Sequence, residues 1–132
     1  MSKESLVTLQ QAFDERRSIY ALGNELPVEP QAIVNMAERV LLHTPSAFNS
    51  QSSRLVVLFG AEHQKLWDIA EEKLRAAVGD GDFSGTKQKL DGFRAAAGTV
   101  LFYEDKNVTE SLQEQFALYA DRFPVWAQQT SA

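Results

Sequence analysis

The chain has 132 residues, of which 44% are hydrophobic and 23% charged, which is the size and composition of one folded globular domain. Its formal net charge is −5 at pH 7 without any Lys/Arg-rich run, so nucleic acid and membrane surfaces, which require a basic face, are not expected partners. Cysteine is absent, and there is neither a signal-peptide core nor an apolar run long enough to span a bilayer, so we expect a cytoplasmic protein without disulfides.

Two amphipathic helices are expected before the first strand. Leucine and phenylalanine recur at helical spacing over residues 5–17 and predict the first of them. A second apolar stripe predicts a helix from Pro30, which suits a first turn, to about His43. Residues 44–53 are polar and lack periodicity, which predicts a loop.

Two apolar runs predict buried strands. Residues 54–60 form a continuous run closed by Gly60, and residues 99–103 form a second. Helices expected over residues 66–78 and 86–97 separate the strands, so the sheet can be parallel or mixed. Two strands alone make a poor sheet, so we expect the fold to borrow strands from further sequence or from a partner chain.

The C-terminal region is expected to hold one more helix, which Pro124 ends or bends. An apolar stripe outlines it, made of Leu112, Phe116, Tyr119 and Phe123. Beyond this helix no terminal element is evident. The chain has no repeat or linker, so we interpret residues 1–132 as a single domain, α+β in class and incomplete at its C-terminal end.

Arg16, Arg17 and Ser18, where the first helix gives way to a loop, are the first candidate binding residues. Two guanidinium groups and a hydroxyl offer donors suited to a phosphate. The dipole at a helix C-terminus opposes an anion, however, so the arginines must supply the attraction themselves. The alternative is that they complement the dipole of the helix.

The second candidate is the loop at residues 45–51, where Ser46, Asn49 and Gln51 concentrate groups that donate and accept hydrogen bonds. Such groups can recognise the polar edge of a flat heterocycle, and loops beside buried strands are common binding positions. The alternative is an ordinary polar turn, because Pro, Ser and Asn are frequent turn residues. Phe48 in the same loop is a candidate contact for a bound ring or substrate.

Together these segments resemble the nitroreductase family of flavoenzymes, and in particular its short subgroup that includes the fungal fatty-acid-repression-mutant protein. The likeness covers the chain from about Ser5 onward, and the ordered set of segments makes it specific. Its segments are Arg-Arg-Ser-Ile-Tyr at 16–20, Pro-Ser-Ala-Phe-Asn-Ser-Gln at 45–51, the strand at 54–60, the helix start at 62–67 and the strand at 98–105.

The resemblance implies a central sheet flanked by helices, in an intertwined homodimer with FMN at each subunit interface. It implies ping-pong chemistry, in which NAD(P)H reduces the flavin and the flavin passes hydride to a nitroaromatic, quinone or related small acceptor. No catalytic protein side chain is implied. The implied FMN-binding residues are Arg16 and Ser18, assisted by Arg17, for the phosphate and ribityl chain, and Ser46, Asn49 and Gln51 for the flavin, some of them across the interface.

Other interpretations remain open. The alternative function is non-catalytic: a truncated flavin-fold module that acts in dimerisation or regulation. Residues 80–91 imitate a calcium-binding loop, but Lys87 stands where that loop needs an aliphatic residue, so we interpret them as a solvated turn. We expect no metal site, with His43 complementing a helix dipole and His63 exposed near a helix start.

Overall fold

The structure is a computed structural model that describes the backbone of residues 3–131 and the side chains of residues 8–130. Its elements, in chain order, are α1 (Lys3–Glu15), α2 (Pro30–His43), the short 3-10 helix η1 (Ala47–Asn49), β1 (Ser53–Phe59), α3 (Gly60–Val78), α4 (Ser84–Arg94), β2 (Gly98–Glu104), α5 (Lys106–Gln115), the 3-10 helix η2 (Ala117–Tyr119) and α6 (Phe123–Ser131).

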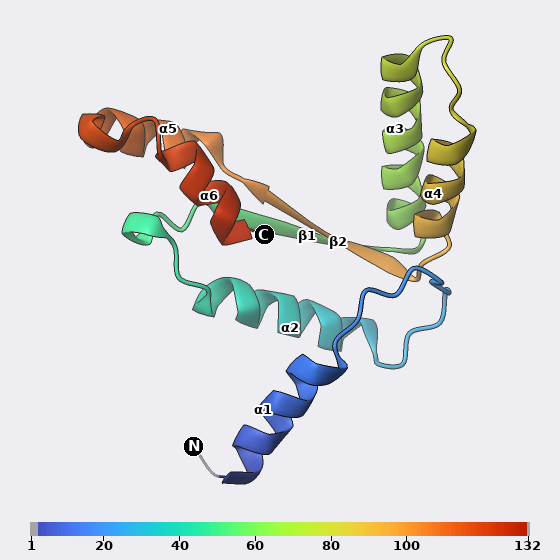
Figure 1. Ribbon diagram of the computed structural model, residues 1–132, viewed down its shortest axis with the longest axis horizontal. Helices are drawn as coiled ribbons and strands as arrows, with labels where there is room; N and C mark the ends of the chain where they lie inside the picture. Colours follow the sequence, from blue (N-terminus) through green and yellow to red (C-terminus); the bar gives the residue numbers. More distant parts are fainter. Residues whose placement is uncertain (1–2, 132) are drawn as a thin grey trace.

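β1 and β2 pair in antiparallel register along their whole length. Ser53 lies opposite Glu104, and Phe59 lies opposite Gly98. The helices that connect the strands, α3 and α4, pack together as a hairpin and return the chain to the end of the sheet where β1 stops (Figure 1). The next strand must therefore run back along β1. The described pair is antiparallel, which excludes an all-parallel sheet and is compatible with the mixed sheet that the sequence also allows.

The first residue of β2 has no room for a side chain. A Cβ on Gly98 would lie 2.7 Å from the carbonyl oxygen of Leu58 and 2.7 Å from the Cδ1 atom of Phe59. Glycine therefore allows the two strands to approach at the point where Phe59 passes directly into α3. No loop separates β1 from α3, so Gly60 belongs to the helix and not to the predicted strand.

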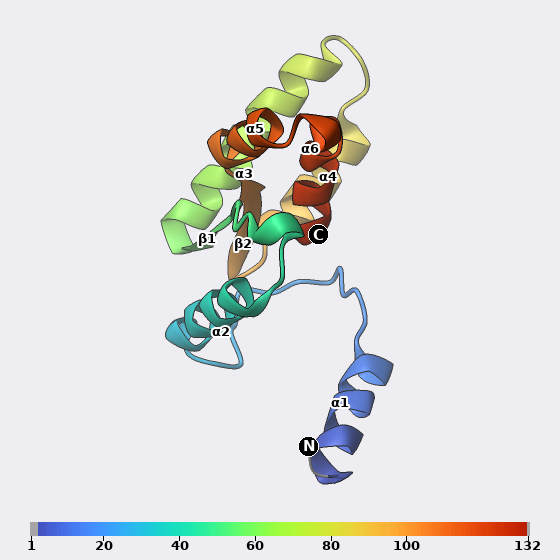
Figure 2. The same ribbon diagram turned by 90° about the vertical axis from the view of Figure 1, so that its left-hand side faces the viewer.

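Helices cover the two sides of the sheet. α2 packs on β1 from one side, and α6, with α5 beside it, packs on β2 from the other (Figures 1 and 2). The buried apolar side chains form two small groups, with Phe83 and Leu90 at the α3–α4 hairpin and Phe123 and Ala127 on α6. The arrangement is α+β, as the sequence predicts.

Much apolar surface stays exposed. Residues 100–103 of β2 are between 36% and 47% exposed, although both faces of this strand are predicted to be buried. α1 extends away from the remainder of the chain (Figures 1 and 2), and Phe13 on it is 73% exposed. Two strands and the described helices offer too little surface to cover each other's apolar faces. Apolar surface of this extent is typical of regions that pack against further protein.

The C-terminal region holds two helices where the sequence predicts one. The chain leaves helical geometry at Phe116, whose φ is −121° and ψ 63°, and turns through η2 before α6 begins. Pro124 does not end a helix but lies in the first turn of α6, where its missing N–H leaves no hydrogen bond unmade. Residues 126–131, for which no element is predicted, continue α6.

His63 is buried, with 1% of its surface exposed, and the prediction of an exposed position is wrong. Its Nε2 lies 3.1 Å from the carbonyl oxygen of Arg94, and its Nδ1 lies 2.8 Å from the hydroxyl of Thr99. The indole N–H of Trp67 donates to the same hydroxyl at 3.2 Å. Because α3 starts immediately after β1, its first turn faces the junction of α4 and β2, and His63 fills that junction.

Candidate functional site

The polar loop after α2 has an unusual backbone. Phe48, Asn49 and Gln51 all have positive φ, at 55°, 52° and 50°. Asparagine tolerates this left-handed region, but a bulky side chain such as Phe rarely adopts it, at a cost of roughly 1–3 kcal/mol. Contacts elsewhere must hold the loop in this shape. An ordinary polar turn, the alternative offered by the sequence, does not require such a conformation.

Hydrogen bonds within the loop fix its shape. The backbone N–H of Asn49 donates to the carbonyl oxygen of Ser46 at 2.9 Å, and that of Gln51 donates to the Ser46 hydroxyl oxygen at 2.9 Å. Ser46 thus accepts from the backbone and keeps its own O–H as a donor. The side chains of Asn49 and Gln51 are predicted donors and acceptors too, so the loop presents a mixed hydrogen-bonding surface.

The end of the loop is tied to the sheet by Arg54. Its Nη1 donates to the carbonyl oxygen of Gln51 at 2.8 Å, and its Nη2 lies 3.1 Å from the Asp105 carboxylate. Asp105 is also the N-cap of α5, accepting from the backbone N–H of Asn107 at 3.1 Å. The buried residue Ser52 accepts from the backbone N–H of Asp105 at 2.9 Å. The loop and the start of α5 are therefore one hydrogen-bonded unit.

The middle of the loop is held by an aromatic cluster, which consists of Phe48, Phe116, Tyr119, Phe123 and Trp126. The Phe48 ring centroid lies 5.1 Å from that of Phe116, 5.9 Å from that of Tyr119, 5.3 Å from that of Phe123 and 5.9 Å from that of Trp126. Such separations are typical of favourable aromatic pairs. The sequence predicts that Phe48 contacts a bound ring or substrate. In the structure its ring contacts the four other aromatic side chains of this cluster.

A cavity of about 510 Å³ borders the loop. Its lining combines the Pro45 end of the loop with the Phe48 and Trp126 rings and with polar side chains of α6. Ser46, Asn49 and Gln51 are not among its lining residues. A flat ring placed in this cavity would contact the Phe48 and Trp126 rings of the aromatic cluster.

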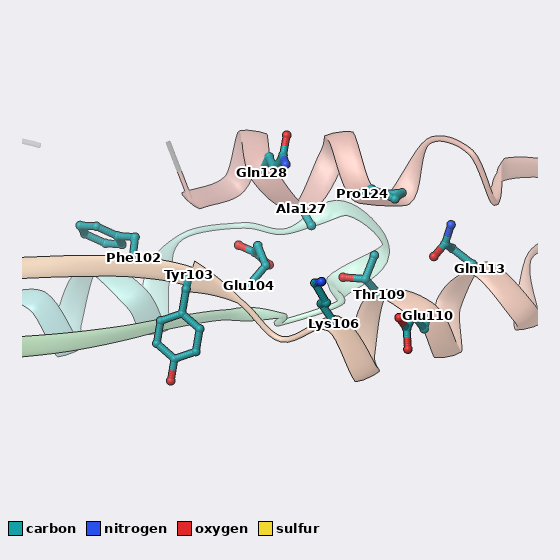
Figure 3. A pocket seen from close by; sticks show the side chains of 10 residues that line it. All are labelled: Phe102, Tyr103, Glu104, Lys106, Thr109, Glu110, Gln113, Pro124, Ala127 and Gln128. Carbon is teal, nitrogen blue, oxygen red and sulfur yellow. The ribbon is translucent and has the colours of Figure 1, made fainter. Parts of the chain in front are cut away.

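A second cavity, of about 590 Å³, lies between the end of β2, α5 and α6 (Figure 3). Phe102 and Glu104 extend from β2 toward α6, whereas Tyr103 points to the other side of the strand. Glu104 accepts from the Ser53 hydroxyl at 2.8 Å through Oε1, while its buried Oε2 has no hydrogen-bond partner among the described residues. None of the residues predicted to bind a cofactor lines this cavity. The polar residues that follow β2 in the sequence are the feature from which this cavity could have been predicted.

The arginine segment lies at the exposed end of α1. Nη1 of Arg17 donates to the carbonyl oxygens of Asp14 and Arg16, each at 2.7 Å. This is the dipole-complementing contact that the sequence offers as the alternative to phosphate binding. Arg16 and Ser18 are exposed. In the described conformation Arg17 binds its own helix, and the neighbouring arginine and serine face solvent.

The two candidate segments do not meet within one chain. The end of α1 and the η1 turn lie apart in both views of the molecule (Figures 1 and 2). A ligand that contacts both segments therefore needs either a rearrangement of α1 or one segment from each of two chains.

Charged residues gather away from both segments, between α3 and α4. Arg94 lies 2.9 Å from the Glu71 carboxylate, 3.0 Å from that of Asp68 and 3.2 Å from that of Asp91. The hydrogen bond from Arg94 holds the pKa of Glu71 below its ordinary value; burial opposes this effect, and Lys87 adds to it. The same bond raises the pKa of Arg94. These contacts join the two helices.

Residues 80–91 do not form a calcium loop. α4 begins at Ser84, so the second half of the imitated loop is helical, and Asp91 binds Lys87 and Arg94. Asp82 accepts from the backbone N–H of Ser84, and this bond lowers the pKa of Asp82. Among the described residues no three His, Asp or Glu side chains are grouped to hold a metal ion.

Comparison with known proteins identifies the fold. The profile of the nitroreductase family matches residues 14–132. The chain belongs to the nitroreductase family. It is 36% identical over 129 residues to HBN1 of Saccharomyces cerevisiae, and 34% identical over 123 residues to the nitroreductase FRM2 of the same yeast. These alignments cover 96% and 91% of the chain.

Solved nitroreductases share its architecture. CinD of Lactococcus lactis, determined in complex with chloramphenicol, is 44% identical, and the match covers 93% of this chain with a TM-score of 0.78. A nitroreductase of Saccharomyces cerevisiae is 32% identical, and that match covers 94% of this chain with a TM-score of 0.81. The chain spans 64% of the length of HBN1, 60% of FRM2 and 61% of CinD.

The parts of this nitroreductase chain that sequence patterns missed are the supports of the predicted loop. Arg54 and Asp105 stand 51 positions apart, and Phe48 and Trp126 stand still further apart, so periodicity within one segment cannot pair them. The available signals were the charges at the start of one strand and the end of the other, and the dense aromatic residues near the C-terminal end.

Proposed function

We propose that this chain is part of an FMN-dependent oxidoreductase that uses NAD(P)H to reduce small aromatic acceptors. Support comes from family membership together with the shaped polar loop at residues 46–51. CinD has been determined in complex with 4-nitrophenol, a nitroaromatic compound, and with chloramphenicol. Nitroaromatics are therefore the acceptor class we propose for this chain, with quinones as a second class that the family resemblance implies.

The residues present fit the cofactor in chemical type. Ser46 keeps an O–H donor, and Asn49 and Gln51 carry amides that donate and accept, which suits the polar edge of a flavin ring. The dense internal hydrogen bonding of the loop fixes these groups before a ligand arrives, which lowers the entropy lost on binding. Arg16 and Ser18 offer a charged fork and a hydroxyl for a phosphate. Arg17 engages the carbonyl oxygens of Asp14 and Arg16 through Nη1, so its Nη2 and Nε are the donors with which it would assist.

The chemistry that bound FMN supplies is ping-pong hydride transfer, from NAD(P)H in one half-reaction and to the acceptor in the other. The chain's own residues bind and orient: the loop side chains hold the polar edge of the ring, and the arginine segment holds the phosphate. The aromatic cluster packs against the loop through Phe48 and holds it in place. No protein acid or base is required for this scheme, and we assign none.

We propose further that the functional unit is a homodimer, with the single domain at residues 1–132 as the core of each copy. The separation of the two candidate segments within one chain supports a site built from the arginine segment of one copy and the polar loop of the other. The extended α1 and its exposed Phe13 support packing between copies. Apolar strand surface is available for the same purpose. A cytoplasmic location remains a prediction, and none of the helices in the described residues has the length and apolar character to cross a membrane.

The test is the protein expressed from its complete gene. We expect a yellow preparation with flavin absorbance that oxidises NADH or NADPH when a quinone or a nitroaromatic is added. A colourless protein that does not bind added FMN contradicts the proposal and supports the alternative function, a non-catalytic module that acts in dimerisation or regulation. Flavin binding without NAD(P)H oxidation would contradict the proposed electron donor.

A further inference from the structure

Phe48 combines an unfavourable backbone conformation with extensive ring contacts. Its φ of 55° places a bulky residue in the left-handed region, where residues without a side-chain penalty, such as glycine, are preferred. The residue nevertheless remains 51% exposed. Burial alone therefore does not account for a phenylalanine here. Contacts of the ring with particular neighbours must therefore offset the free-energy cost of its backbone conformation.

Those neighbours belong to distant parts of the chain. Phe116 and Tyr119 come from the end of α5 and from η2, whereas Phe123 and Trp126 come from α6. The Phe48 and Trp126 rings are stacked, with an interplanar angle of 21°. The ring of Phe48 is thus the connection between the polar loop and the helical segment at residues 106–131.

The position of Phe48 within the loop determines what this connection can do. Phe48 stands between Ser46 and Asn49, and the bond from the Asn49 backbone N–H to the Ser46 carbonyl oxygen closes the turn around it. Rotation of the Phe48 backbone to an ordinary conformation would open this turn. The three polar side chains of the loop would then lose their common orientation.

We propose that Phe48 is a positioning residue for the cofactor: its ring, clamped by the aromatic cluster, holds the left-handed turn that presents Ser46, Asn49 and Gln51 to FMN. This inference rests on the proposed function. Phe48 acts through the loop and need not touch the cofactor. The Arg54 contact with the Gln51 carbonyl oxygen fixes the far end of the loop, so the aromatic clamp and Arg54 hold it at two points.

The experiment compares FMN affinity in the protein expressed from its complete gene, by titration of flavin fluorescence. Phe48→Ala removes the ring but keeps a side chain that disfavours positive φ, and we expect its dissociation constant to rise about three- to tenfold, the size of effect expected from losing aromatic contacts. Phe48→Tyr keeps the ring and should bind FMN within about twofold of the wild type. Hydrogen exchange without FMN should accelerate at the Gln51 amide in Phe48→Ala only.

The matched control is Phe93→Ala. Phe93 packs on Trp67, with ring centroids 5.1 Å apart, so this change also deletes an aromatic pair, but between α3 and α4. We expect it to lower the unfolding temperature without changing the FMN dissociation constant. If Phe48→Ala fails to fold by circular dichroism, Trp126→Ala and Trp126→Phe replace it, with weaker binding expected for the alanine variant alone.

Each outcome is decisive. If the wild type binds FMN and Phe48→Ala (or its replacement Trp126→Ala) has the same dissociation constant, the positioning role is overturned and the proposed function stays intact. Equal weakening by Phe93→Ala also overturns it, because the effect is then general destabilisation. A wild type that binds no FMN overturns both proposals, because there is then no cofactor to position.

Discussion

The Nδ1 atom of His63 lies 2.8 Å from the Thr99 hydroxyl, and this contact joins the first turn of α3 to the start of β2. The carbonyl oxygen of Arg94 can only accept, so Nε2 of His63 carries the proton and Nδ1 accepts from Thr99. The Thr99 oxygen in turn accepts from Trp67. Each buried polar atom of this network has a partner, which is the condition under which a buried polar group stabilises a fold.

Replacing His63 tests this network. His63→Phe keeps a ring of related shape but leaves the Arg94 carbonyl with fewer partners and the Thr99 hydroxyl without an acceptor, so we expect the free energy of unfolding to fall by roughly 1–3 kcal/mol. Urea denaturation measures the change. His43→Phe, at the exposed end of α2, is the control and should shift stability by less than about 0.5 kcal/mol. Equal stability of the His63 variant and the wild type would contradict the assignment.

A pair of glycines tests the strand contact. Gly98→Ala places a methyl group 2.7 Å from the Leu58 carbonyl oxygen, so we expect the unfolding temperature to fall or the variant not to fold. Gly92→Ala is the matched change, because nothing lies within 4 Å of its Cβ position inside α4, and alanine favours helix by about 1 kcal/mol. We expect it to be stabilising. Opposite signs in thermal unfolding support the register of β1 and β2, whereas a harmless Gly98→Ala contradicts it.

Glu71 links stability to pH. Arg94 lowers its folded-state pKa below the ordinary value of 4.5, so its contribution is fully present above that value and is lost as the pH falls through the lowered pKa. The Glu71→Gln variant should therefore be less stable than the wild type at neutral pH, and the difference should shrink under acid conditions. Glu72→Gln is the control, because Glu72 is exposed and, among the residues with described side chains, forms an ion pair only with its exposed neighbour Lys73. A Glu71→Gln deficit that is independent of pH in thermal unfolding argues against this linkage.

Sequence patterns predicted the helices and strands well where the signal is local. The stripe of α2 and the apolar runs of β1 and β2 depend on neighbouring residues, and their bounds differ from the predictions by no more than one residue at either end. The family and its α+β fold followed from ordered motifs. The antiparallel pairing did not, because it depends on α3 and α4 packing into a hairpin. His63 was misplaced because imidazole suits both surface and interior, and only the partner residue Thr99 decides between them.

In the candidate site, too, some features could be predicted from local sequence and others depend on contacts between distant residues. Ser46, Asn49 and Gln51 could be chosen from the sequence because their side chains are suited to hydrogen bonding. Their backbone conformation could not, since it depends on the contact of Phe48 with Trp126 and of Arg54 with Asp105. The family resemblance implied that some site residues lie across an interface, but residue patterns alone could not separate the arginine segment from the loop within one chain, because that separation depends on the path of the chain between α1 and α2.

Exposed apolar residues on α1 predict association. Phe13→Asp places a charge on a surface that we propose is buried between two copies, so it should raise the dissociation constant of the dimer or give monomers at micromolar concentration. Light scattering coupled to gel filtration measures the mass. Lys73→Asp, an exposed position on α3, should leave the mass unchanged. A wild-type monomer would contradict the proposed dimer directly.

Arginine substitutions separate phosphate binding from helix capping. Arg16→Ala should weaken FMN binding by about one to two decades, because a charge-assisted hydrogen bond typically contributes roughly 1.5–3 kcal/mol. Arg17→Ala should weaken it less, since Arg17 is engaged with the carbonyl oxygens of Asp14 and Arg16. Fluorescence titration with FMN gives both constants. A larger loss for Arg17→Ala than for Arg16→Ala would contradict the proposed assignment of Arg16 as the main phosphate contact.

Mixing two damaged proteins tests the central claim most directly, that one FMN is held by the arginine segment of one copy and the polar loop of another. Arg16→Ala and Asn49→Ala variants, each impaired in FMN binding, are unfolded together and refolded as a mixture. In a symmetric two-chain site, random pairing leaves about a quarter of all sites with both segments intact, so we predict that this fraction of tight FMN binding returns. Tight binding that does not return, although each variant dimerises and the wild type binds FMN, would contradict the shared site.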